Sequence, residues 1–374
     1  MKFMTKVFVA LAALAPACHK STIDNKQLKD FQQVNLVANN AAYNPSHVDS
    51  TLQNAWGLAF SSTGIPWVNS NGGHVSEVYS AEGAILRAPV AIPGPGGAPG
   101  GVPSGIVFSG GKGFKLSNGQ ASNFLFVGED GVLSGWNGAA GNAALLIKDN
   151  SATSSYKGLA LAAKGGANYI YAANFKTGRI DVWDTTFAPV TMNFRDFAIP
   201  SGYAPFNIQS IGSWLFVTYA KVGPDGDDVA GPGNGFVDIF NTDGSFVRRL
   251  ASRGALNSPW GVTAAGPTFL DDNNMSMDEG EAHGSNSGKG RGGHDNEVDS
   301  VLLVGNFGDG RINVFGQDGT FLGQLQSHSH TIVIDGLWAL SFAPSTSTVD
   351  PSRLYFTAGP AKEMDGLFGY LIKQ

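Results

Sequence analysis

The feature that most constrains the fold of this chain is a pattern that recurs six times. Six segments open with small or apolar residues at the start of an expected strand; they begin at residues 54, 103, 156, 205, 258 and 335 and read NAWGLAF, PSGIVF, YKGLALAA, PFNIQSIG, SPWGVTAA and DGLWALSF. A second apolar strand follows each segment, and then a turn leads to a third strand with period-two alternation, as in GRIDVWD and GRINVFGQDG. A fourth strand follows in most units, for example at 86–92, 246–252 and 321–326. Such self-similarity indicates a repeat architecture.

Six units of four strands predict an all-β fold, a six-bladed β-propeller over residues 33–374. The last unit ends at Gln374 after three strands, whereas the segment QVNLVANN at 33–40 precedes the first unit and has no partners there. We expect this N-terminal strand to join the last blade and close the ring, which removes exposed strand edges. The 51 Gly and 18 Pro suit the many tight turns that this fold needs.

The N-terminus, MKFMTKVFVALAALAPACHK, has the organisation of an export signal. Two lysines precede an eleven-residue apolar stretch, which is too short to span a bilayer. We therefore expect a signal peptide at 1–17, a tether at 18–32 and an exported protein. Cys18 is the only cysteine and follows the apolar stretch as in bacterial lipoproteins, so a lipid on its thiol would be the sole contact with a membrane. The other interpretation is cleavage after Ala17 and free secretion.

One polar segment interrupts the regular spacing of the units. Residues 271–300 contain eight acidic and two basic residues and almost no apolar ones, so they cannot cover a core. We interpret them as a disordered insertion between the first two strands of the fifth blade. The alternative is a cation-binding or partner-binding segment, but the spacing matches no defined calcium loop.

Several longer stretches carry a resemblance to a known family. They are NLVANN, NAWGLAFSSTGIPWVNSNG, IPGPGGAPGGVPSGIVF, YAKVGPDGDDVAGPGNGFVDIF, VGNFGDGRINVF and LYFTAGPAKEMDGLFG. Over residues 33–374 the chain resembles a family of exported bacterial propeller proteins usually labelled conserved hypothetical, which also has a member in giant amoeba viruses. The resemblance implies a propeller and export, and it implies no activity. The chain departs from the family at 271–300, where the family usually has a short connection.

Candidate functional residues lie on one face of the expected propeller. The first strands line the central channel, and the loops that enter them share a face with the loops that join second to third strands. The candidate ligand-binding residues on this face are Glu129, Asn174, Asn306, Asp335, Trp56 and Trp260, and the candidate metal ligands are Asp225, Asp227 and Asp228. A structural interpretation stands beside each, because Asn and Asp at strand ends cap turns and Trp packs between blades.

Two functions fit these residues. One is a binding module at the cell envelope whose rim recognises a protein, a peptide or a glycan. The alternative is a Ca²⁺-dependent lactone or ester hydrolase resembling the gluconolactonase-like propellers, in which carboxylate and amide oxygens hold a cation that polarises an ester carbonyl. The two differ in whether the oxygens of the rim converge on a cation.

Charge and missing motifs exclude other classes. A net charge of −6 disfavours nucleic acid and an anionic membrane surface as partners. The sequence has no G-x-S-x-G for a serine hydrolase and no C-x-x-C-H for covalent haem. His328 and His330 form a His-x-His pair, but no third metal ligand lies near them in the sequence.

Overall fold

The computed structural model describes residues 25–270 and 300–374. The predicted signal peptide, Cys18 and all but the last residue of the 271–300 insertion lie outside the described residues. In the part that is described, no helix combines the length and the apolar character that a membrane crossing needs.

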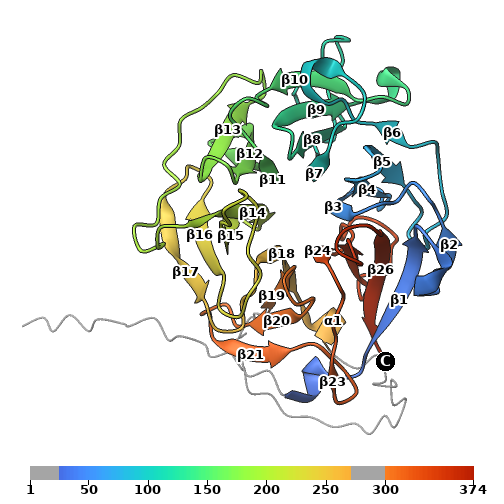
Figure 1. The fold of residues 1–374 in the computed structure, drawn as a ribbon, viewed down its shortest axis with the longest axis vertical. Helices are drawn as coiled ribbons and strands as arrows, with labels where there is room; N and C mark the ends of the chain where they lie inside the picture. Colours follow the sequence, from blue (N-terminus) through green and yellow to red (C-terminus); the bar gives the residue numbers. More distant parts are fainter. Residues whose placement is uncertain (1–24, 271–299) are drawn as a thin grey trace, which may run out of the picture.

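Six twisted sheets stand around a central axis, which confirms the predicted propeller (Figure 1). The first blade contains β3 (Ala55–Phe60), β4 (Pro66–Ser70), β5 (Val75–Val78) and β6 (Val90–Ala91), and the second contains β7 (Pro103–Phe108), β8 (Phe124–Gly128), β9 (Val132–Trp136) and β10 (Leu145–Asp149). The third has β11 (Tyr156–Lys164), β12 (Ala167–Asn174) and β13 (Arg179–Asp184), and the fourth has β14 (Tyr203–Ile211), β15 (Trp214–Lys221), β16 (Phe236–Asn241) and β17 (Phe246–Ser252).

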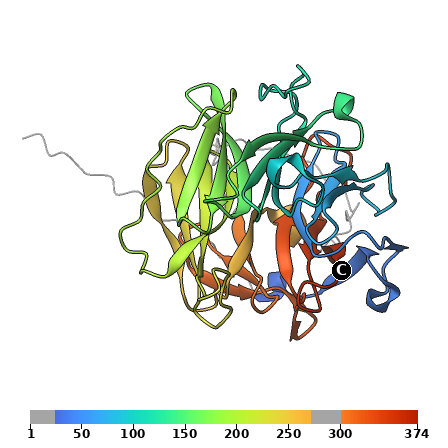
Figure 2. The same cartoon turned by 45° about the horizontal axis from the view of Figure 1, so that its top comes forward.

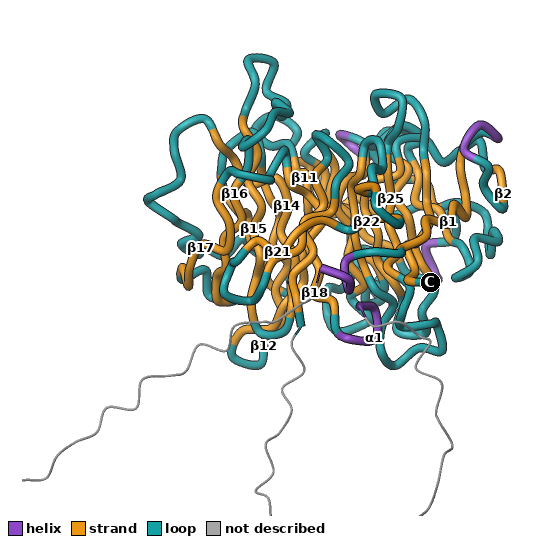
Figure 3. The backbone as a smooth tube through the Cα atoms, turned by 90° about the horizontal axis from the view of Figure 1, so that it is seen from below, coloured by secondary structure: helices purple, strands orange, loops and turns teal. Residues whose placement is uncertain are grey.

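The fifth blade contains β18 (Pro259–Ala265), β19 (Val301–Asn306), β20 (Ile312–Phe315) and β21 (Phe321–Gln324). The sixth contains β24 (Leu337–Ser341), β25 (Leu354–Ala358) and β26 (Leu367–Lys373). Within each blade, consecutive strands pair antiparallel, and β18 pairs with β19 on either side of the polar insertion. The tilted view shows the blades packed side by side, and the side view shows strands running between two faces made of loops (Figure 2 and Figure 3).

The N-terminal strand closes the ring as predicted. β1 (Phe31–Ala38) pairs antiparallel with β26, for example Val34 with Tyr370, and the short β2 (His47–Val48) adds to the outer side of β1. Figure 1 shows β1 beside β26 in the sixth blade. The propeller begins earlier than expected, because Leu28 and Phe31 are buried in its core; residues 25–32 are therefore part of the fold and not of a tether.

Glycines explain why the six first strands lie so close to one another. A Cβ on Gly57 would lie 2.2 Å from the carbonyl oxygen of Ser104 in the next blade, and a Cβ on Gly158 would lie 2.0 Å from Oδ1 of Asn207. A Cβ on Gly261 would similarly lie 2.6 Å from the carbonyl oxygen of Trp338. Only a residue without a side chain fits at these approaches, so this glycine layer narrows the channel.

A polar residue on the third strand of the first, third and fifth blades binds the residues that lead into the first strand. Oγ1 of Thr51, in the loop before β3, donates to Oε1 of Glu77 at 2.6 Å. The Tyr156 hydroxyl, at the start of β11, donates to Oδ2 of Asp181 at 3.1 Å. Nδ2 of Asn313 donates to the Ala255 carbonyl, before β18, at 3.2 Å. These bonds fix the loops that enter the first strands and therefore position the rim of the channel.

Candidate functional site

An aromatic plug closes the channel at the face where the first strands begin, which we call the rim. Trp56 and Trp338 stack with ring centroids 3.7 Å apart, and Phe307 stacks on Trp338 at 3.9 Å. Trp260 meets both tryptophans edge-on, and its Nε1 donates to the carbonyl oxygen of Lys157 at 3.1 Å. The predicted ligand residues Trp56 and Trp260 are 1% and 5% exposed, so they form the floor of the rim.

In the two repeated Asn-Phe pairs, the asparagine has a structural role and the phenylalanine packs at the rim. Oδ1 of Asn306 accepts from the Asn257 backbone N–H at 3.1 Å, and its Nδ2 donates to the Ala255 carbonyl at 2.8 Å. Asn174 behaves similarly, since its Nδ2 donates to Oδ2 of Asp181 at 2.8 Å and its Oδ1 accepts from the Thr177 N–H at 3.3 Å. Both asparagines are buried; Asn174 fixes its own turn and Asn306 fixes the loop before β18, so they are not placed as ligand contacts. The phenylalanines that follow them belong to the plug.

A buried lysine lies beside this plug. Lys157, the second residue of β11, has a side chain that is only 4% exposed, and its Nζ forms ion pairs with Oε1 of Glu129 and, at 2.8 Å, with Oδ1 of Asp227. The ammonium also lies 5.4 Å from the ring of Trp56 and 5.7 Å from that of Phe175. Burial alone would lower the pKa of Lys157, but the two carboxylates outweigh it and hold the pKa above its ordinary value. The lysine is therefore a fixed positive charge and not a nucleophile.

A third carboxylate reaches the rim on an unusual turn between β25 and β26. Ala361, Lys362 and Glu363 have φ of 56°, 58° and 66°, which is the left-handed region. This conformation costs a residue with a Cβ about 1–2 kcal/mol. Oδ2 of Asp335 supports the turn by accepting from the Ala361 N–H at 3.0 Å, which gives this predicted residue a positioning role.

Glu363 is connected to the aromatic plug through an asparagine. Nδ2 of Asn54 donates to Oε2 of Glu363 at 2.7 Å, and Oδ1 of Asn54 accepts from Nε1 of Trp338 at 2.8 Å. Burial, and next the negative charge of Glu129, raise the pKa of Glu363 to about 7. This carboxyl therefore changes its charge near neutral pH, and when it is ionised the rim holds three carboxylates around one ammonium.

The sequence pointed to only part of this cluster. Glu129 and Asp227 were predicted and are brought together, whereas Lys157 and Glu363 were not among the predicted site residues. Lysine stands in the third blade at a register position that the other blades fill with Trp56, Ser104, Phe206, Trp260 and Trp338, and that contrast was an available signal. For Glu363 the quoted stretch LYFTAGPAKEMDGLFG gave no sign of a left-handed turn.

The three aspartates predicted as metal ligands do not converge. Oδ1 of Asp225 accepts from the Asp227 backbone N–H at 3.2 Å, and Asp227 itself pairs with Lys157. Asp228 is partly buried, and this burial raises its pKa to about 6. Across residues 25–270 and 300–374, no group of three or more His, Cys, Asp or Glu side chains is placed to hold a metal ion. Asp225, Asp227 and Asp228 therefore do not form an oxygen cage for a cation among themselves.

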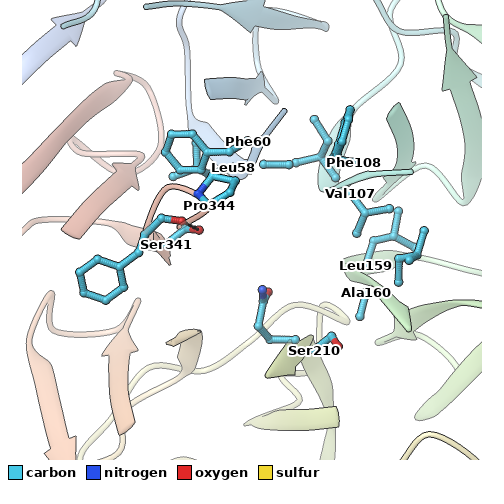
Figure 4. Close-up of a pocket in the computed structure, with 14 residues that line it drawn as sticks. Leu58, Phe60, Val107, Phe108, Leu159, Ala160, Ser210, Ser341 and Pro344 are labelled. Atoms are coloured by element: carbon cyan, nitrogen blue, oxygen red, sulfur yellow. Dashed lines mark hydrogen bonds between the residues drawn. The ribbon is translucent and has the colours of Figure 1, made fainter. Parts of the chain in front are cut away.

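The opposite end of the channel, which we call the lower mouth, has a different character. A cavity of 360 Å³ opens there and is lined by uncharged residues from five blades, among them Leu58, Phe60, Phe108 and Leu159 (Figure 4). Its polar side chains are those of Gln209, Ser210 and Ser341. The charged residues of the rim do not line this cavity.

Comparison with known proteins identifies viral relatives. No protein-family model matches the chain. Uncharacterized protein L690 of Acanthamoeba polyphaga mimivirus is 33% identical over 356 residues, which cover 91% of this chain and 86% of the relative. Uncharacterized protein R648 of the same virus is 29% identical and covers 91% of this chain and 80% of its own length.

Among solved structures, a streptogramin B lyase aligns with a TM-score of 0.48 at 13% identity over 91% of this chain and 96% of its own. Virginiamycin B lyase from Staphylococcus aureus aligns with a TM-score of 0.43 at 11% identity over 92% and 99%. At these scores and identities, neither alignment carries an inference about activity.

Proposed function

This chain belongs to the same family as the mimivirus protein L690, and we propose that its propeller is a recognition module whose rim binds a ligand with a positively charged group. The charge balance of the rim is the observation that supports this proposal most. Glu129, Asp227 and Glu363 act on one another electrostatically, and the single ammonium among them is that of Lys157. The cluster therefore has excess negative charge.

The exposure of these groups indicates which of them a ligand could reach. The Lys157 side chain is 4% exposed, whereas those of Glu129 and Asp227 are 25% and 57% exposed. A ligand at the rim would therefore meet carboxylates first. A unit positive charge 4 Å from a carboxylate gains about 1 kcal/mol in water and about 4 kcal/mol near a protein surface. A negatively charged ligand would be repelled.

Aromatic rings add to the attraction for a cation. Phe307 is partly buried and stacks on Trp338, so the plug offers rings beside the carboxylates. Ammonium and guanidinium groups are attracted to ring faces by about 0.5–2 kcal/mol. Basic peptide side chains and amino groups on glycans carry such cations. We further propose that the protein is exported and either held at the envelope by a lipid on Cys18 or secreted; this rests on the N-terminal sequence alone.

The experiment is a titration of the mature protein with N-acetyl-trilysine amide, monitored by tryptophan fluorescence. We expect saturable binding that weakens at least fivefold in Asp227→Asn and Glu363→Gln, and that weakens with added salt. Asp243→Asn, in the exposed turn between β16 and β17, is the control and should leave the affinity unchanged. Equal affinities for trilysine and triglutamate, or equal loss in the control, would contradict the proposal.

A further inference from the structure

The third blade ends one strand early, unlike the other five. Its sheet contains β11, β12 and β13 only, whereas the third strands of the other blades pair on their outer sides with β6, β10, β17, β21 and β1. In the described residues, the outer edge of β13 is met only by the bridge between Trp183 and Pro189. No other backbone hydrogen bond between described residues reaches this edge, although Ile180 and Val182 are 8% and 3% exposed and reach solvent only through the neighbouring groove.

The sequence after β13 explains the missing strand. The Val190 N–H donates to the Val182 carbonyl at 2.9 Å, and the chain then leaves the edge. It is drawn away because Val190, Met192 and Phe194 pack into the core between the third and fourth blades. The ring of Phe194 lies 5.8 Å from that of Tyr171 and 5.3 Å from that of Phe240. The segment that would form a fourth strand packs between the blades instead.

The direction of the remaining backbone groups follows from strand geometry. Alternate residues of an antiparallel strand direct their N–H and C=O groups to the same side. The Val182 carbonyl and the Asp184 N–H point outward, because they bond to Val190 and Ala188. The N–H and C=O of Ile180 therefore point outward as well, beyond the place where the chain departs. Such an edge is a template for another strand.

A groove of 450 Å³ runs beside this edge and has more cations than carboxylates around it, since the one carboxylate that lines it, Asp181, accepts hydrogen bonds from Tyr156 and Asn174. Its walls are β13, the segment Pro189–Met192 and the loop from Asn150 to Ser154. Lys148 and Arg179 line it, and Nζ of Lys176 donates to the Ala152 carbonyl in its wall at 3.2 Å. None of these three cations forms an ion pair with a described residue. Its volume is within the usual range for ligand sites.

We propose that this edge binds an extended peptide segment with acidic side chains, which adds to the third blade as its fourth strand, antiparallel to β13. Backbone bonds to Ile180 and the free N–H of Val182 would hold the segment. Acidic side chains would meet Lys148, Lys176 and Arg179. The occupant differs in charge and in place from the cationic ligand proposed for the rim, so the two proposals stand or fall separately.

The experiment is selection of decapeptides from a random display library on the immobilised mature protein. We expect enrichment of sequences that alternate β-branched with acidic residues. Their affinity, measured by fluorescence anisotropy, should fall at least tenfold in the Lys148→Glu, Arg179→Glu double variant, which changes a half-buried and an exposed side chain and should still fold. The control Lys112→Glu, Lys115→Glu makes the same charge change at exposed lysines of the second blade and should bind normally.

Hydrogen exchange separates strand addition from simple charge attraction. In the free protein the Ile180 amide should exchange faster than that of Asp181, and the selected peptide should slow it at least tenfold. A peptide that binds without slowing exchange at 178–184 would overturn the proposal. So would a selection that enriches no acidic peptide, or peptides that bind the double variant as well as the wild type.

Discussion

The two mouths of the channel are lined by different chemistry although the same six strands form both. At the rim, Lys157 is paired with carboxylates beside stacked aromatic rings. At the lower mouth, a cavity of 360 Å³ is lined by uncharged residues. The repeat therefore determines where the strands lie. Individual residues that differ from their equivalents in the other blades determine what each mouth can bind.

Energetics support the view that the rim charges serve a function. A buried ammonium contributes little net stability, because its desolvation offsets much of its attraction to the carboxylates. Aromatic residues stand at the same register position in other blades, for example Phe206 and Trp260, so packing alone does not need a lysine there. The left-handed turn that carries Glu363 adds strain at the same place.

We expect the largest difference in stability between substitutions at the two mouths when the charge of Lys157 is removed. Lys157→Met leaves Glu129 and Asp227 without their cation; because water still reaches both carboxylates, we expect it to lower the free energy of unfolding at pH 8 by about 2 kcal/mol. Gln209→Met, at the lower mouth, should cost less than about 1 kcal/mol. Urea unfolding measures both. Equal losses would show that the two mouths do not differ in this respect.

A second prediction concerns the glycine layer between the mouths. Gly158→Ala places a Cβ against Asn207, so we expect it to destabilise the protein by about 1–3 kcal/mol. Gly266→Ala, at the lower end of β18, has open space around its Cβ and should be neutral or stabilising by about 0.4–1 kcal/mol. Thermal unfolding distinguishes them. A Gly158→Ala variant as stable as the wild type would contradict the close approach of the first strands.

The third prediction is that the stability of the protein depends on pH and that part of this dependence comes from Glu363 at the rim. Burial, followed by repulsion from Glu129, raises the pKa of Glu363 from its ordinary value of 4.5 to about 7. The folded state therefore holds this proton more tightly than the unfolded state, so stability increases as the pH falls from 8 to 5. In Glu363→Gln this increase should be smaller by about 1 kcal/mol, with solvent screening taken into account. An unchanged pH profile would contradict the assignment.

A smaller effect should follow from relieving the left-handed turn. Lys362 has a φ of 58°, which glycine adopts without strain, so Lys362→Gly should stabilise the protein by about 0.5–1 kcal/mol. The same change at Lys112, which has no positive φ, should not stabilise it. Stabilisation in both variants, or in neither, would count against strain at this turn.

Much of the fold could be predicted from the sequence because period-two alternation and turn residues are local signals. The sixfold spacing gave the blades, and the unpaired strand at 33–40 gave the closure by β1. The open third blade could not be predicted, since its cause is the packing of Met192 and Phe194 between blades, which no local pattern records.

The site was predicted less well for a related reason. Glu129 and Asp227 were named because their loops share a face, which topology alone dictates. Asn174 and Asn306 were predicted as ligand contacts, but they bind backbone groups of the protein, Asn174 in its own turn and Asn306 in the loop before β18. Glu363 reaches the rim only through a backbone conformation that its residue types rarely adopt.

The most direct test of a cation-binding rim is the affinity for N-acetyl-trilysine amide at pH 6 and at pH 8, because this probe keeps its charge at both. Since Glu363 ionises near pH 7, we predict binding that is about three- to tenfold tighter at pH 8 in the wild type, and a clearly smaller difference in Glu363→Gln, where Asp228 still titrates near pH 6. Binding that is equal at the two pH values in the wild type, or tighter at pH 6, would contradict the account.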